Sequence, residues 1–229
     1  MSGYDNYKRV TIFAGHYGSG KTNLAINYAF MLRRYLDCVS IVDLDIVNPY
    51  FRTKDSEDVI KKSGIRVISS SFANSNVDLP SIPAEAYAII EDDGHHIVVD
   101  VGGDDRGALA LGRYMPGLRK SGDFEMILVV NKYRPLTRDS GGAVEILREI
   151  EAASGLPFTG IINNSNLGPE TTADTVLSSI GYADEISQIT GLPVKMTAVR
   201  DDICDMLYGR IEDIFPIKLY HSSGGRFLL

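Results

Sequence analysis

The sequence predicts an α/β fold of three layers, in which a mostly parallel sheet of about seven strands lies between two layers of helices. Two observations predict this fold. Strand patterns and helix patterns alternate along most of the 229 residues. The strand segments are also short apolar runs without polar alternation, which is typical of strands buried on both faces of a parallel sheet.

Seven segments have the pattern of a buried strand. Val, Ile and Leu are common in them, and Gly, Asp or Asn closes most of them. We therefore expect strands at residues 10–14, 38–45, 65–69, 96–103, 125–131, 158–164 and 193–199.

Six segments have the pattern of a helix. Pro83 stands in the first turn of one of them, where proline is tolerated. Gly64 and Gly155 follow the ends of two others, and Asp201 is expected to cap the last one. We expect these helices at residues 22–36, 55–64, 83–93, 139–154, 171–190 and 201–209.

The composition predicts one domain over residues 1–229, with 210–229 as a C-terminal extension, because no linker or low-complexity segment interrupts the chain. The formal net charge of −7 argues against broad non-specific binding of nucleic acids. No apolar run reaches the roughly 20 residues that cross a bilayer. Cys38 and Cys204 fit reduced, packed thiols of a cytoplasmic protein better than a disulfide.

The loop after the first predicted strand reads GHYGSGKT and fits the P-loop pattern G-x-x-x-x-G-K-[ST]. Its glycines leave backbone N–H groups open to phosphates, and the next helix points its positive end to the same place. A tight glycine turn without a ligand is the alternative. Lys21 is expected to be catalytic and to reach the β- and γ-phosphates, and Thr22 to hold Mg²⁺. We expect nucleotide contacts from Gly15, His16, Tyr17, Gly18, Ser19, Gly20, Lys21, Thr22 and Asn23.

Two further predicted strands end in carboxylates that suit a magnesium nucleotide. Asp43 and Asp45 lie two residues apart and therefore on the same side of their strand. Asp100 closes another apolar run, and an aspartate there can hold the shell of Mg²⁺. Gly103 can offer its N–H to the γ-phosphate. Asp43 alone also fits a loop cap, and the candidate metal residues are Thr22, Asp43 and Asp100.

The P-loop, the D-x-D strand end and the D-x-G-G turn together resemble the deviant-Walker ATPases, which include MinD, ParA and the nitrogenase iron protein. The chain is also similar to the nucleotide-binding domain of cobyrinic acid a,c-diamide synthases. The resemblance implies ATP or ADP with Mg²⁺, a catalytic Asp45 that positions the attacking water, and a catalytic Asp43 nearer the metal. It also implies switch segments at 45–52 and 101–107 that respond to the γ-phosphate.

His16 departs from the pattern of that family. The family has a lysine after the first glycine of the P-loop, and this lysine reaches across a dimer to the partner's nucleotide. A neutral histidine lacks that permanent charge, although it can be protonated. Arg52 or Arg106 could supply the charge instead. The resemblance therefore leaves open whether a homodimer closes around the nucleotide.

The predicted sixth strand closes with Asn163 and Asn164, and in the family an asparagine at this strand end commonly hydrogen-bonds adenine. We expect Asn163 to make this contact, with Asn164 as the second choice and an asparagine-rich turn as the alternative. The segment NKYR at 131–134 is similar to the guanine motif N-K-x-D, but Arg134 replaces the aspartate and the motif comes one strand early. We interpret it as a strand-end loop, and ATP is preferred to GTP.

These patterns predict a Mg²⁺-dependent ATP-binding protein, a slow ATPase that acts as a nucleotide-driven switch on a protein client, for example in metallocentre assembly or enzyme activation. The alternatives are a ParA- or MinD-like partition or positioning ATPase, an ATP-dependent amide ligase, and a binding module that hydrolyses almost nothing. We expect no nucleic-acid or membrane partner, since the sequence offers neither a clear basic surface nor a membrane-targeting helix.

Overall fold

The computed structural model describes residues 7–45, 60–69, 84–103 and 105–220. Within these ranges, the strands form one sheet in the order β3-β2-β4-β1-β5-β6-β7-β8. Every neighbouring pair in this order is parallel. The strands are β1 (Val10–Ala14), β2 (Val39–Leu44), β3 (Arg66–Ser69), β4 (His96–Val101), β5 (Phe124–Val130), β6 (Gly160–Asn163), β7 (Val194–Arg200) and β8 (Ile214–Ile217).

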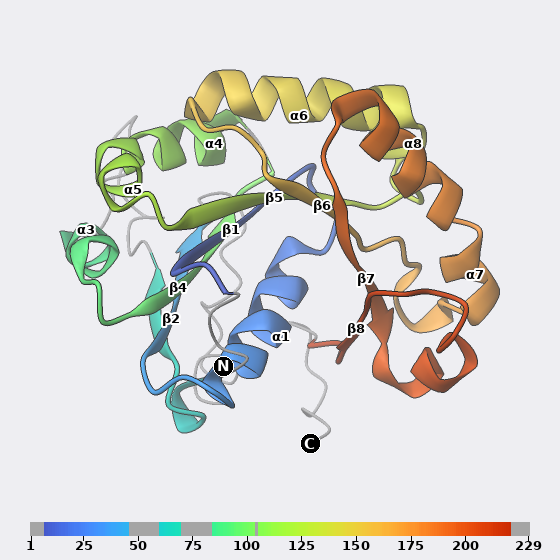
Figure 1. Ribbon diagram of the computed structural model, residues 1–229, viewed down its shortest axis with the longest axis horizontal. Coiled ribbons are helices and arrows are strands. Elements are labelled where there is room, and N and C mark those ends of the chain that lie inside the picture. Colours follow the sequence, from blue (N-terminus) through green and yellow to red (C-terminus); the bar gives the residue numbers. More distant parts are fainter. Residues whose placement is uncertain (1–6, 46–59, 70–83, 104, 221–229) are drawn as a thin grey trace, which may run out of the picture.

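Helices cover both faces of the sheet. Figure 1 shows α1 on one side of the strands and α4, α6 and α8 on the other. The described helices are α1 (Lys21–Arg33), α3 (Ala84–Glu91), α4 (Asp105–Gly112), α5 (Met115–Ser121), α6 (Ser140–Ser154), α7 (Ala173–Leu177) and α8 (Ile180–Thr190). Three short 3₁₀ helices are η2 (Pro135–Thr137), η3 (Gly168–Glu170) and η4 (Asp201–Met206).

Two large apolar clusters fill the spaces between the layers. On one face, Leu24 and Leu32 of α1 pack with Phe13 of β1. On the other face, residues of α3, α5, α6 and α8 pack against the alternate side chains of the same strands, among them Ile12. All five residues of β1 are buried, as expected for a central strand. The predicted three-layer α/β fold is therefore confirmed, while the assignment of residues 1–229 to one domain stays a prediction.

The sheet has one more strand than we expected. Strand β8 lies within the segment that we had assigned to a C-terminal extension, and it pairs with β7 at the edge of the sheet. Its sequence is IFPI, and Pro216 lowers the strand signal because proline cannot donate to a ladder. An edge strand tolerates this proline, since one side of β8 has no strand neighbour among the described residues.

The helix predicted at 171–190 is wrong as one continuous element, because it breaks into α7 and α8 at Ser178 and Ser179. Side chains from elsewhere take up the carbonyls at the end of α7. The Tyr133 hydroxyl donates to the Thr175 carbonyl at 2.7 Å, and Lys132 Nζ donates to the Ser178 carbonyl at 2.7 Å. These tertiary contacts replace the helical hydrogen bonds at the break.

Two smaller expectations also fail, and two helices were missed. The helix predicted at 201–209 is the 3₁₀ helix η4, and the residue that precedes it is Arg200, so Asp201 does not cap it. Cys38 is exposed and not packed, because β2 begins one residue later, whereas Cys204 is buried. Helices α4 and α5 were not predicted at all, and most of the helix predicted at 55–64 lies outside the described residues.

Candidate functional site

The loop between β1 and α1 has the backbone conformation of a glycine-dependent anion cradle. Gly15, Gly18 and Gly20 have φ values of 148°, 77° and 86°. A Cβ atom at Gly15 would lie 2.5 Å from the Val129 carbonyl oxygen. A Cβ at Gly20 would lie 2.4 Å from Asn164 Nδ2. Both the backbone angles and the available space therefore require glycine at these positions.

Lys21 and Thr22 open α1 and face two different partners. Lys21 is 6% exposed, and its Nζ donates to the His16 carbonyl at 3.0 Å within the same loop. The Thr22 hydroxyl donates to Asp100 Oδ2 at 2.6 Å. The structure thus brings the end of β4 to the start of α1, as the two motifs predicted.

Asp100 is a carboxyl group enclosed by the fold. It is 1% exposed and lies in register with Phe13 of β1 and Asp43 of β2. Burial raises the pKa of Asp100 to about 6, although Lys21 and the Thr22 hydrogen bond act to lower it. Lys21 and Thr22 therefore compensate the charge of the Asp100 carboxylate only in part, and a bound cation would compensate it further.

Asp43 and Asp45 lie at the end of β2. Asp43 is 2% exposed, and its Oδ1 accepts a hydrogen bond from the Asp45 backbone N–H at 2.9 Å. This bond is the loop cap that we named as the alternative for Asp43. Asp45 follows the strand directly and is partly exposed, and its charge acts to raise the pKa of Asp100. The two carboxylates of the D-x-D segment therefore lie beside Asp100.

The end of β4 also touches the P-loop. A Cβ atom on Gly103 would lie 2.4 Å from the Tyr17 backbone nitrogen, so only glycine allows this approach. Part of the predicted switch at 101–107 thus adjoins the P-loop. Residues 46–52 of the other predicted switch, including Arg52, lie outside the described residues, and so does the side chain of Arg106.

The two asparagines at the end of β6 point to different places. Asn163 is fully buried, and its Nδ2 donates to Ser179 Oγ at 2.9 Å, away from the P-loop. Asn164 Nδ2 donates to the Ser19 carbonyl at 2.7 Å. Asn164, our second choice for the base contact, is therefore the residue that borders the cradle.

The side chain of Asn23 points toward the C-terminal part of the chain. Its Nδ2 donates to the Lys218 carbonyl at 3.0 Å, and its Oδ1 accepts from the Tyr220 N–H at 2.8 Å. In this arrangement only the backbone of Asn23 remains for a nucleotide contact.

Several buried polar atoms around the P-loop have no hydrogen-bond partner among the described residues. Folded proteins rarely leave such atoms unpaired, because each costs the desolvation of a polar group. Their number around one loop therefore indicates a polar ligand. The atoms are His16 Nδ1, Ser19 Oγ, Asp100 Oδ1 and Asn164 Oδ1.

Sequence reasoning missed Arg134. We interpreted NKYR as a strand-end loop, and Asn131 indeed serves the loop, since its Oδ1 accepts from the Tyr133 N–H at 3.0 Å. Arg134, however, reaches the P-loop, where its Nε donates to the Gly18 carbonyl at 2.6 Å. The only signal in the sequence was its position after a strand that could neighbour β1.

The chain has the fold of P-loop NTPases. Among solved structures it matches FtsY of Mycoplasma mycoides with a TM-score of 0.57 and 20% identity, over 85% of this chain and 61% of FtsY. It matches FtsY of Thermotoga maritima with a TM-score of 0.56 and 20% identity, over 83% of this chain and 61% of the other. FlhF, in its complex with GTP and Mg²⁺, gives a TM-score of 0.54 and 13% identity, over 83% of this chain and 65% of FlhF.

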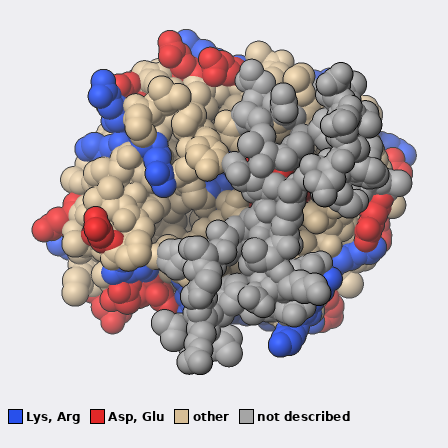
Figure 2. All heavy atoms as spheres, turned by 180° about the vertical axis from the view of Figure 1, so that it is seen from behind, with Lys and Arg blue, Asp and Glu red and all other residues tan. Residues whose placement is uncertain are grey.

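The chain thus spans less than two thirds of the length of these proteins, and identities this low show the fold alone. Comparison with protein-family models gave no match, and comparison with curated proteins gave no significant match. Among the described helices, none has the length and apolar character that a membrane span requires. Acidic and basic side chains are interspersed on the described part of the face shown in Figure 2.

Proposed function

We propose that this chain is a Mg²⁺-dependent ATP-binding protein of the deviant-Walker type, which hydrolyses ATP slowly and acts as a nucleotide-driven switch on a protein client. One observation carries the proposal. A P-loop with glycine-only geometry is ringed by four buried polar atoms that lack partners among the described residues. A magnesium nucleotide supplies phosphate acceptors for donors such as Ser19 Oγ, an amino group of the base for Asn164 Oδ1, and a cation for Asp100 Oδ1.

The side chains around the P-loop suggest a role for each candidate residue. Thr22 and Asp100 are the residues that would hold Mg²⁺, which neutralises phosphate charge when it is bound. Lys21 would move from the His16 carbonyl to the β- and γ-phosphates, since its ammonium group already lies inside the loop. Asp45 would orient the attacking water, with Asp43 fixing the backbone of Asp45 through its loop cap.

ATP is the proposed nucleotide. A guanine base needs a carboxylate for its N–H groups, and the segment after β6, residues 164–167, contains no acidic residue. Asn164 Oδ1 is buried without a partner among the described residues and is an acceptor, as the amino group of adenine requires. The GTP in the FlhF complex belongs to that protein, whose identity with this chain is only 13%.

We place the switch in the cytoplasm and assign it a protein client. Two free cysteines fit a reducing cytoplasm. A switch of this kind needs segments that respond to the γ-phosphate, and Gly103 is close enough to the P-loop to serve in one of them. A second copy of the chain or a protein client would bind one conformation of these segments. Metallocentre assembly and enzyme activation are examples of processes with such a client.

Calorimetric titration with Mg·ATP and Mg·GTP tests the proposal. We expect the wild type to bind Mg·ATP more tightly than Mg·GTP. Lys21→Ala should weaken Mg·ATP binding by more than roughly tenfold, because a charge-assisted contact is lost. Asp45→Ala should keep binding and lose phosphate release. Lys120→Ala, an exposed lysine of α5, is the control. A wild type that gives no heat with either nucleotide would overturn the proposal.

A further inference from the structure

Side chains hold the carbonyls of the P-loop from outside the cradle. The Gly18 carbonyl accepts from Arg134 Nε at 2.6 Å, and the Ser19 carbonyl accepts from Asn164 Nδ2 at 2.7 Å. In a trans peptide the C=O and the following N–H point in opposite directions. The Ser19 N–H closes a turn onto the His16 carbonyl at 3.2 Å. Holding the Ser19 carbonyl outward turns the N–H of Gly20 toward the cradle, and holding the Gly18 carbonyl fixes the peptide from which this turn is made.

Gly18 makes room for the arginine. A Cβ atom at this position would lie 3.1 Å from Arg134 Nε and 3.2 Å from Cζ, so the guanidinium packs on the bare backbone of the loop. The φ of 77° at Gly18 also disfavours a side chain there. The backbone conformation and the limited space at Gly18 thus both favour glycine where Arg134 contacts the loop.

The loop that presents Arg134 is itself held in place. The Arg134 N–H donates to the Asn131 carbonyl at 3.2 Å, and the Tyr133 hydroxyl bonds to the Thr175 carbonyl of α7 at 2.7 Å. Asn131 Nδ2 donates to the Asn166 carbonyl at 3.2 Å, which ties the loops after β5 and β6 together. Arg134 is therefore delivered to the P-loop by an ordered scaffold, which reduces the entropy cost of its contact.

The Arg134 guanidinium has hydrogen-bond donors beyond the one that it gives to the Gly18 carbonyl. In the part of the chain that the structure describes, its Nη1 and Nη2 atoms have no hydrogen-bond partner, and the side chain is exposed. A permanent cation on the wall of a phosphate cradle favours polyanions in a protein whose net charge is −7.

We propose that Arg134 is a positioning residue for polyphosphate binding. Its guanidinium fixes the Gly18 carbonyl, and with it the shape of the amide cradle, while its charge attracts the phosphate chain. The proposal rests on the proposed nucleotide binding but goes beyond it, because it concerns the phosphate chain and not the base. It also gives the NKYR segment a role that a guanine motif does not have.

Calorimetry with two probes, inorganic tripolyphosphate and Mg·ATP, tests this role. Since Arg134 acts on the cradle, Arg134→Ala should weaken both probes by a similar factor, about tenfold. Arg134→Lys should restore part of the affinity, because it keeps the charge and one donor. Arg138→Ala, a nearby arginine whose side chain is 79% exposed, should bind like the wild type. The melting temperature of each ligand-free variant verifies that it is folded.

Three other outcomes would overturn either the role of Arg134 or the proposed nucleotide binding. If Arg134→Ala weakens only Mg·ATP and leaves tripolyphosphate unchanged, the arginine contacts base or ribose and the positioning role is wrong. If neither probe is affected, or if Arg134→Lys restores nothing, the proposal is also overturned. If the wild type binds neither probe, the proposed nucleotide function fails, which is a separate result from a failure at Arg134.

Discussion

Asp100 combines burial with an unsatisfied oxygen. Its Oδ2 accepts from Thr22 at 2.6 Å, while Oδ1 is buried without a partner among the described residues. Burial raises its pKa from 3.8 to about 6. In the ligand-free protein this carboxyl group therefore carries a cost of ionisation that the unfolded chain does not have.

The cost has a definite dependence on pH. Between about pH 4 and pH 6 the folded state holds a proton on Asp100 that the unfolded state has released, so stability falls as pH rises through this window. Asp100→Asn cannot ionise. We expect it to be more stable than the ligand-free wild type by about 2 kcal/mol at pH 7.5, with the difference shrinking toward pH 4.5. Urea unfolding of both proteins across this pH range measures the difference in their free energies of unfolding. A difference that does not change with pH would contradict the prediction.

Two residues that the sequence assigned to one metal site, Thr22 and Asp100, lie within hydrogen-bond distance in the structure. Thr22 and Asp100 were expected to meet, because a P-loop and a neighbouring strand end share one edge of a parallel sheet. The choice between Asn163 and Asn164 was not predictable, since adjacent residues at a strand end point to opposite sides. The Arg134 contact forms because β5, the strand before it, lies beside β1. Local sequence patterns do not predict which strands are neighbours in a sheet.

At the scale of elements, a polar network crosses the sheet beneath α1. Lys195 of β7 forms an ion pair with Glu125 of β5, and the Thr11 hydroxyl of β1 donates to Glu125 at 3.0 Å. The lysine passes over β6 at Gly160, where a Cβ atom would lie 2.8 Å from Lys195 Cε. Burial and the charge of Glu125 raise the pKa of Tyr28 on α1. The network thus links three strands and a helix.

Breaking the network should cost stability. Lys195→Met leaves Glu125, whose side chain is only 10% exposed, without its cation. Because the lysine itself is partly solvated, we expect a loss of about 2 kcal/mol in the free energy of unfolding, less than for a fully buried pair. The double variant Lys195→Met with Glu125→Gln should recover most of it, since glutamine still accepts from Thr11. Equal stability of the single and double variants, measured in urea, would argue against this view.

Elements whose signal is local were predictable, and elements that depend on neighbours were not. Strand β1 matches its prediction because every residue in it is buried and all but Thr11 are apolar. Helix α4 contains Gly107 and Gly112 and has weak intrinsic propensity, and it forms where it packs on α6. The break between α7 and α8 depends on Lys132 and Tyr133, more than 40 residues earlier in the chain.

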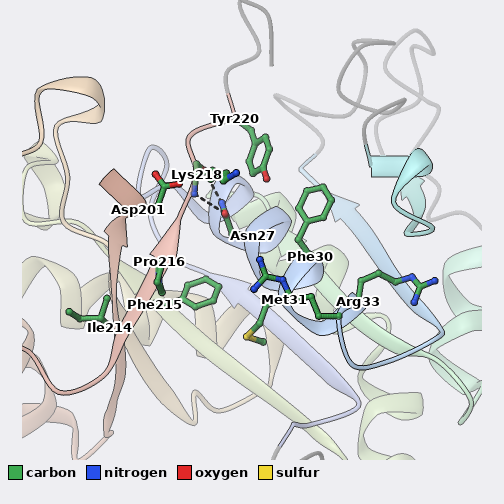
Figure 3. Close-up of a pocket in the computed structure, with 11 residues that line it drawn as sticks. Asn27, Phe30, Met31, Arg33, Asp201, Ile214, Phe215, Pro216, Lys218 and Tyr220 are labelled. Carbon is green, nitrogen blue, oxygen red and sulfur yellow. Dashed lines mark hydrogen bonds between the residues drawn. The ribbon is translucent and has the colours of Figure 1, made fainter. Parts of the chain in front are cut away.

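At the scale of the whole molecule, the C-terminal part of the described chain is fastened to the helix of the P-loop. After β8 the chain runs along α1, where Asn27 Nδ2 donates to the Lys218 carbonyl at 2.9 Å and Asn27 Oδ1 accepts from the Lys218 N–H at 2.8 Å. Figure 3 shows this pair at the wall of a groove of about 680 Å³ between α1 and β8. Asn23 makes two further bonds one turn closer to the P-loop. Hydrogen bonds from α1 therefore hold the chain just after β8, at the edge of the sheet.

Removing the Asn27 amide should weaken the attachment of the segment after β8 to α1. Asn27→Ala deletes both bonds to Lys218, and we expect the free energy of unfolding to fall by about 2 kcal/mol, since backbone groups lose their partners. Hydrogen exchange at the Lys218 amide should accelerate, because its N–H donates to Asn27. Asn27→Asp keeps the acceptor for that N–H but places a carboxylate oxygen against the carbonyls of Asn23 and Lys218, so it should also be less stable than the wild type. If Asn27→Ala unfolds like the wild type and the Lys218 amide exchanges at the same rate, β8, the Asn23 bonds and apolar contacts hold the C-terminal segment without Asn27.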